Sequence, residues 1–167
     1  MIRAYLLTVM IWATLFWADG ASAQMPPALA TPGETVIATF HAEGAQIYEC
    51  KADSNGGLSG VFREPIATLL LGGRTAGRHY AGPTWQLTDG GAVTGKAVAN
   101  TPGATANDIS WLKLDVVNRR GSGLLTRAST VRRINTQGGS AQGACNQAGA
   151  FRSVAYSADY NFLSKDD

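Results

Sequence analysis

The segment VAYSADYNFL, residues 154–163, constrains the fold more strongly than any other stretch of the chain. Every second position carries an aromatic or small apolar side chain, at Tyr156, Ala158, Tyr160 and Phe162, and the positions between them are polar or small. Successive side chains of a β-strand point to opposite faces of a sheet. This pattern therefore predicts a strand with one buried face and one solvated face.

The rest of the sequence is also typical of short strands separated by turns. No window has the sustained 3.6-residue apolar period of an amphipathic helix, and twenty glycines interrupt the chain. The turn KADSNGG contains an Asn-Gly pair, which favours a hairpin. Further strands are expected at residues 35–40, 45–50, 66–71, 84–88, 92–99 and 110–117, and over 123–136 as one bent strand or two. These features predict a single all-β domain, either an antiparallel β-sandwich or a small β-barrel.

The first 23 residues have the features of a signal peptide. Arg3 provides a short positive region, an apolar run extends from Ala4 to about Ala18, and the small residues ASA precede Gln24 at the expected cleavage site. The sequence therefore predicts an exported protein, periplasmic or extracellular, that has no membrane association once the signal peptide is removed.

Signal cleavage would leave three further parts. Residues 24–34, QMPPALATPGE, are rich in proline and alanine and are expected to form a flexible arm. Residues 35–163 form the predicted β domain, which is long enough to fold around one hydrophobic core. Residues 164–167 form a short polar tail.

The charge of the chain is nearly balanced. Fourteen Lys and Arg side chains stand against twelve Asp and Glu, a formal net charge of +2. This balance gives no electrostatic reason to expect nucleic acid as a partner. The pairs Arg119-Arg120 and Arg132-Arg133 are isolated from one another, and we expect them to be solvated strand or turn residues.

Cys50 and Cys145 are the two cysteines of the chain. Exported proteins mature in an oxidising compartment, where two cysteines commonly pair, so we expect a structural disulfide between them. A reactive thiol or a thiolate metal ligand is the alternative. Neither cysteine lies in a C-x-x-C motif, which disfavours both alternatives.

Five segments, found in this order, resemble a known protein family: QIYEC, GRHYAGPTW, ISWLKL, VRRINTQGG and YSADYNF. Between about Val36 and Phe162 the chain resembles the exported bacterial and fungal family called domain of unknown function 3455. The resemblance implies an exported, mostly β domain with a cysteine pair and no established activity. Some fungal relatives carry a malate dehydrogenase label, which the residues of this chain can test.

A NAD-dependent dehydrogenase is disfavoured by the glycine spacing. Such an enzyme needs a G-x-G-x-x-G turn that opens a helix, so that backbone amides face the pyrophosphate. Gly72, Gly73 and Gly77 follow an apolar strand but do not have this spacing, and no helical pattern follows them. We therefore expect no nucleotide cofactor and no other cofactor.

The residues that could form a metal or catalytic centre are few. His41, Glu43 and His79 make no H-x-H or H-x-x-x-H pair, so no metal site is predicted. There is no G-x-S-x-G motif for a nucleophilic serine. Glu49 and Asp159 lie within the family-like segments and could act as a carboxylate pair in glycoside hydrolysis.

The stretch GRHYAGPTW, residues 77–85, is the most feature-rich part of the sequence. Gly82 and Pro83 favour a sharp turn, and the stretch is then a structural corner with aromatic packing residues. In the functional alternative, part of the stretch joins a more distant tryptophan in one wall of a ligand pocket. The residues of that predicted wall are Arg78, His79, Tyr80, Trp85 and Trp111.

Three functions remain open on the sequence. The leading hypothesis is a non-enzymatic exported domain that binds a small molecule or an envelope glycan at this aromatic-rich patch, because aromatic rings suit sugars and other flat ligands. One alternative is a secreted hydrolase that uses His79 or the pair Glu49 and Asp159. The other is a structural or surface-interaction protein of the envelope. The sequence does not specify the oligomeric state.

Overall fold

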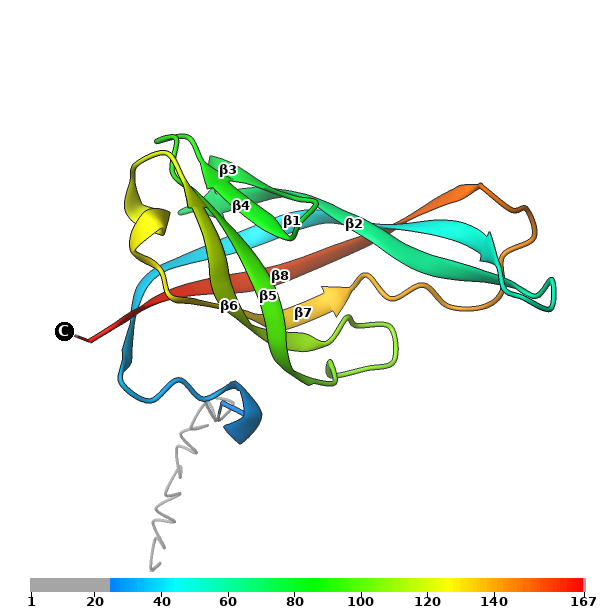
Figure 1. The fold of residues 1–167 in the computed structure, drawn as a ribbon, viewed down its shortest axis with the longest axis horizontal. Helices are drawn as coiled ribbons and strands as arrows, with labels where there is room; N and C mark the ends of the chain where they lie inside the picture. The colour runs from blue at the N-terminus through cyan, green and yellow to red at the C-terminus, as the bar shows by residue number, and fades with distance from the viewer. Residues whose placement is uncertain (1–24, 167) are drawn as a thin grey trace, which may run out of the picture.

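A computed structural model describes residues 25–166, and the predicted signal peptide lies outside these residues (Figure 1). The described chain contains two short 3-10 helices and eight β-strands, and none of these residues forms an α-helix. The elements are η1 (Pro27–Leu29), β1 (Glu34–Ala52), β2 (Leu58–Leu71), β3 (Arg74–Tyr80), β4 (Thr84–Leu87), β5 (Ala92–Thr101), β6 (Trp111–Arg120), η2 (Leu124–Arg127), β7 (Thr130–Gly138) and β8 (Phe151–Lys165).

The eight strands pair antiparallel in chain order, and β8 pairs back onto β1, so that hydrogen bonds close the sheet into a barrel. The predicted all-β antiparallel fold is confirmed. The β1–β8 pairing runs from Glu34 opposite Lys165 to Glu49 opposite Phe151. Beyond the barrel, β1, β2 and β8 continue together as a long projection, which we call the extension (residues 47–64 and 151–154; Figure 1).

The core lies inside the barrel and is built by the inward faces of the strands. The alternation predicted in β8 is confirmed, since Tyr156, Ala158, Tyr160 and Phe162 are all buried. The ring of Phe162 packs edge-on against Phe40 of β1, with 5.8 Å between the ring centroids. Similar aromatic contacts join other strands, so the large side chains of several strands meet in one cluster.

The N-terminal strand is longer than the sequence predicted. Two strands were expected on either side of the stretch HAEG, but β1 runs through it as one strand of 19 residues. Gly44 makes this possible, because a β-carbon at that position would overlap the carbonyl oxygen of Ile66 on β2. The missing side chain lets β1 and β2 approach closely in the middle of their pairing.

The segment 123–136 also differs from the prediction of strand throughout. Gly123 takes a φ of +132°, and the chain then forms η2, which buries Leu125 completely. Asp89 accepts a hydrogen bond from the backbone N–H of Leu124, at 3.0 Å, and so holds the start of η2. Strand pairing resumes only at Thr130.

The segment expected to be a flexible arm contains one residue that packs into the fold. Leu29 of η1 is fully buried, and η1 contacts β5 and β6. The Nζ atom of Lys113 on β6 donates a hydrogen bond to the backbone carbonyl of Ala30, at 3.2 Å. No helix in residues 25–166 combines the length and the apolar character needed to cross a membrane.

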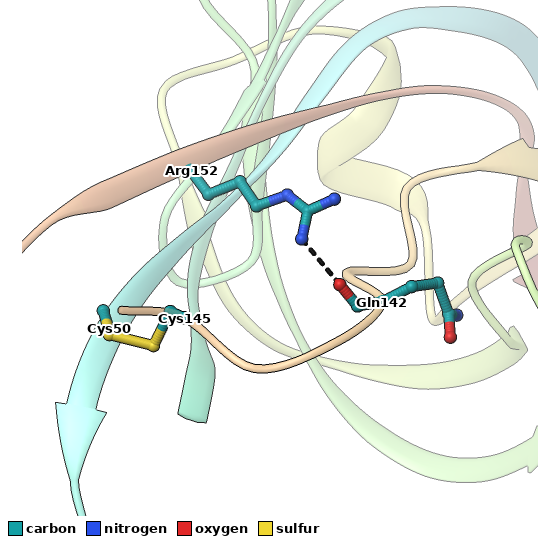
Figure 2. The surroundings of a disulfide bond; sticks show 4 residues. All are labelled: Cys50, Gln142, Cys145 and Arg152. Atoms are coloured by element: carbon teal, nitrogen blue, oxygen red, sulfur yellow. Dashed lines mark hydrogen bonds between the residues drawn. A yellow bond between two sulfur atoms is a disulfide. The ribbon is translucent and has the colours of Figure 1, made fainter. Parts of the chain in front are cut away.

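The predicted disulfide between Cys50 and Cys145 is confirmed, with 5.9 Å between the two Cα atoms. It joins the end of β1 to the loop between β7 and β8 (Figure 2). Arg152 of β8 supports the same loop by donating a hydrogen bond to the carbonyl of Gln142, at 2.7 Å (Figure 2). The disulfide therefore holds the loop between β7 and β8, which contains no strand, against the extension.

Reduction of the disulfide is expected to destabilise the protein substantially. The bond joins residues 95 positions apart, and loss of such a long covalent loop costs up to about 4.5 kcal/mol in the chain-entropy model. Urea unfolding of the oxidised protein, the reduced protein and the double variant C50A/C145A measures the difference. Equal unfolding midpoints for the three forms would contradict a stabilising role.

Candidate functional site

A cavity of about 870 Å³ lies at the end of the barrel from which the extension projects. Its lining comes from β1 to β8 and from the loop before β6. Three buried aromatic side chains form its floor: His79, Trp85 and Tyr160. This volume falls within the range of about 300–1,000 Å³ that is usual for small-molecule sites.

Strand register brings the floor residues together. His79 on β3 lies directly opposite Trp85 on β4, and both side chains point into the barrel. Their rings stack with 4.6 Å between centroids and 7° between planes. Tyr160 of β8 contacts both rings, at 5.0 Å from His79 and 5.3 Å from Trp85.

Small residues leave the space above this floor. Gly95 on β5 lines the cavity beside Trp85, and a β-carbon there would lie 3.1 Å from the Cζ3 atom of the indole ring. Ala97, two positions along the same strand, lines the cavity and is exposed, so it lies at the mouth. Large side chains at these two positions would fill part of the cavity.

His79 is neutral at physiological pH. Its Nδ1 atom lies 2.9 Å from the carbonyl oxygen of Thr84, which can only accept, so Nδ1 carries the proton and Nε2 is left as an acceptor. Burial lowers the pKa of His79 from 6.5 to about 3. The bond to Thr84 opposes this shift, and the positive charge of Arg133 adds to it.

The two tyrosines of the inner face of β8 are also uncharged. The hydroxyl groups of Tyr156 and Tyr160 lie 3.3 Å apart. Burial is the main cause that raises the pKa of both phenols, so they stay protonated and can donate hydrogen bonds.

Arg133 supplies a positive charge to the cavity wall. Its Nε and Nη2 atoms donate hydrogen bonds to the carbonyl oxygen of Ser110, at 3.0 and 2.8 Å. The sequence predicts a solvated strand or turn residue at Arg133, but the side chain is half-buried and lines the cavity. Alternation could have revealed this, because Arg133 shares the inner face of β7 with the buried Val131.

Two buried donors in the lining have no protein acceptor. Gln46 of β1 is 2% exposed, and its Nε2 atom has no hydrogen-bond partner among the described residues. The Nε1 atom of Trp85, which is 1% exposed, is likewise without a partner there. Buried N–H groups without acceptors are rare in folded proteins. Sequence reasoning missed Gln46, which has no distinguishing motif around it.

The structure does not bring the five residues of the predicted wall together on one face of the sheet. His79 and Trp85 line the cavity, whereas Arg78 and Tyr80 lie on the outer face of β3. There Arg78 donates to the Oε1 atom of Gln86, at 2.9 Å. Trp111, at the start of β6, is half-buried and lies outside the lining.

The outer residues form a polar cluster of their own. The guanidinium group of Arg78 lies 5.0 Å from the ring centroid of Tyr80, and Arg120 donates to the Tyr80 hydroxyl at 2.9 Å. Between β3 and β4, Gly82 takes a φ of +132° in the predicted turn. Gly82 and Pro83 also contribute to the cavity lining.

Glu49 and Asp159, the carboxylate pair of the hydrolase alternative, are not brought together. Asp159 pairs with His41 on β1, and Glu49 lies eight positions further along the same strand, which is about 26 Å. Glycoside hydrolysis needs its two carboxyl groups about 5–10 Å apart. These two side chains therefore cannot flank one glycosidic bond.

Each of these carboxylates has a local partner instead. Glu49 lies 3.4 Å from the Nζ atom of Lys51. Asp159 lies 2.8 Å from Nδ1 of His41 and accepts a hydrogen bond from Asn135, also at 2.8 Å. Residues 25–166 contain no group of three His, Cys, Asp or Glu side chains placed to hold a metal ion.

The family model described as "Protein of unknown function (DUF3455)" matches residues 70–164, more than half of the chain. The chain belongs to this family. The matched segment begins at the end of β2 and ends in β8, so it includes His79, Trp85, Arg133 and Tyr160. Gln46 on β1 lies outside it. No curated protein and no solved structure matches the chain.

The depressed pKa of His79 predicts a loss of stability in acid. Its folded-state pKa of about 3 lies below the usual 6.5, so the unfolded chain binds an extra proton between these values. The free energy of unfolding therefore keeps its full value with respect to His79 above pH 6.5. It decreases as the pH falls towards 3, by up to about 1.4 kcal/mol per pH unit. Urea unfolding at pH 7, 5 and 4 measures it.

The variant His79→Asn removes this titration and should flatten the pH dependence of unfolding. The matched control is His41→Gln, which changes the other histidine of the chain on the exposed face of β1 and should keep the wild-type slope. A slope unchanged in His79→Asn would show that the buried imidazole is not its source.

Proposed function

We propose that this protein is exported and binds a small amphipathic molecule in the cavity, without transforming it chemically. The observation that carries the proposal is a cavity of about 870 Å³ whose lining is largely aromatic and aliphatic and contains buried donors that lack protein acceptors. A small ligand with an apolar body fits this lining, and its acceptor atoms would pair with the buried donors once their side chains turn towards the cavity.

The geometry favours a compact ligand over an extended glycan. Sugar rings stack on open aromatic faces, but Trp85 is 1% exposed and His79 covers one of its faces. The outer residues Arg78 and Tyr80 both donate hydrogen bonds to the Oε1 atom of Gln86 and lie outside the cavity lining. A molecule that enters the barrel end can reach the floor, whereas a polymer would contact only the rim.

Export is supported by two features. The N-terminal 23 residues have the composition of a signal peptide. The disulfide between Cys50 and Cys145 is of a kind that persists in oxidising compartments and is rare in the cytosol. We therefore place the working site of the protein in the periplasm or outside the cell.

Binding of an apolar probe is the direct test of the cavity. Naphthalene-2-carboxamide, an uncharged molecule with a flat apolar body, should raise the thermal midpoint of the mature disulfide-bonded protein. At a concentration one hundred times its Kd, a ligand of the native state adds about 2.7 kcal/mol to the free energy of unfolding. This corresponds to an increase in Tm of roughly 5–10 °C for a domain of this size.

The variant Ala97→Phe should abolish the shift, because a benzyl group at the mouth occupies the entrance. Val98→Phe is the matched control: it introduces the same side chain at the next position, which is exposed and outside the lining. If wild type shows no shift with this probe or with the corresponding carboxylate, or if both variants keep the shift, the cavity is not a binding site.

A further inference from the structure

We propose that the cavity selects ligands that carry a carboxylate, and that Arg133 is the residue that binds it. The inference rests on the proposed function and specifies its ligand class as a small amphipathic carboxylic acid. Three observations carry it: an arginine without an acidic partner, a cationic lining, and a second unpaired donor in the same cavity.

The charge of Arg133 is not neutralised within the described chain. The ion pairs of residues 25–166 join His41 to Glu43 and Asp159, Lys51 to Glu49, and Arg63 to Glu64. Arg133 instead donates two hydrogen bonds to one backbone carbonyl, that of Ser110. These bonds fix the plane of the guanidinium group. A further interaction joins it to the Tyr160 hydroxyl, and the remaining N–H groups are left for a ligand.

The charged residues around the cavity are predominantly positive. Of the cations in the lining, Arg63 is already paired with Glu64, which leaves Lys96 and Arg133, and Asp108 contributes the single carboxylate. Asp108 is already engaged by the loop before β6: its Oδ1 atom accepts from the N–H of Gly138 at 2.6 Å, and its Oδ2 atom accepts from Thr105. The bond from Gly138 is the main cause that lowers the pKa of Asp108. An acidic ligand therefore meets net positive charge.

The second donor is the side-chain amide of Gln46. Gln46 is 2% exposed, lines the same cavity as Arg133 and interacts with the Tyr156 hydroxyl, and its Nε2 atom makes no hydrogen bond of ordinary geometry within residues 25–166. An ionised carboxylate is an acceptor-only group with room for several donors. It suits an arginine and an amide N–H better than a hydroxyl or an amine would, since either of those brings donors of its own.

The remaining lining residues determine which apolar group the ligand can carry. Leu112, Leu114 and Pro83 provide aliphatic contacts, and the rings of Trp85 and Tyr160 lie at the floor. This surface suits a flat or branched hydrocarbon body. Because the cavity is partly shielded from water, the attraction between Arg133 and a carboxylate is stronger there than on an exposed surface.

The test compares two probes of the same shape that differ in charge: naphthalene-2-carboxylate and naphthalene-2-carboxamide. Wild-type protein should bind the carboxylate about tenfold more tightly or better, which is the effect of one charge-assisted hydrogen-bonded contact. The Arg133→Gln variant should bind both probes with the weaker affinity. Arg127→Gln, which removes an exposed arginine outside the lining, should keep the wild-type preference.

The outcomes separate the two proposals. Equal binding of both probes by wild type would overturn the role of Arg133 and leave the cavity as a binding site, whereas binding of neither probe would overturn the proposed function itself. Arg133→Lys provides a second variant with the charge retained, in case Arg133→Gln does not fold. It should keep a preference for the carboxylate, and a preference that is unchanged in Arg133→Gln would contradict the assignment.

Discussion

The pairing of β1 with β8 is the interaction on which the rest of the structure depends. It joins the first and last strands of the domain, so the barrel closes only when residues at opposite ends of the chain meet. The same register places Phe40 opposite Tyr160, and Tyr160 in turn supports the stacked rings of His79 and Trp85. Without this closure the cavity would have no floor.

Side-chain size along the inward faces explains why one end of the barrel is filled and the other is open. Large residues such as Phe40, Phe162 and Leu125 fill the core. Towards the extension, β5 presents Gly95 and Ala97 at positions where bulky side chains would meet the indole ring or close the mouth. An eight-stranded barrel has room for its own side chains or for one small ligand, and this sequence leaves part of the space unfilled.

Much of the fold follows from local sequence patterns. The alternation over residues 154–163 predicted the buried face of β8, and the pair Cys50 and Cys145 predicted the disulfide. The continuity of β1 could not be predicted, because the effect of Gly44 depends on the approach of β2. The turn of η2 likewise depends on a partner distant in sequence, Asp89.

The candidate site was only partly predictable, for the same physical reason. His79 and Trp85 were placed in a wall together with Arg78 and Tyr80, although neighbouring residues of a strand face opposite sides of the sheet. Alternation with Val131 places Arg133 on the inner face of β7, but it does not show that this face borders a cavity at that point. The contact of Arg133 with Ser110 arises only when β7 pairs with β6.

The most direct test of the account follows the two indole N–H groups during titration with naphthalene-2-carboxylate. Beyond the predicted signal peptide, the chain contains two tryptophans: Trp85 lines the cavity and Trp111 does not. In ¹⁵N-resolved NMR spectra, we predict that the Trp85 indole resonance moves progressively and saturates while the Trp111 resonance stays in place. Movement of the Trp111 resonance alone, or of neither, would contradict the claim that this cavity is the ligand site.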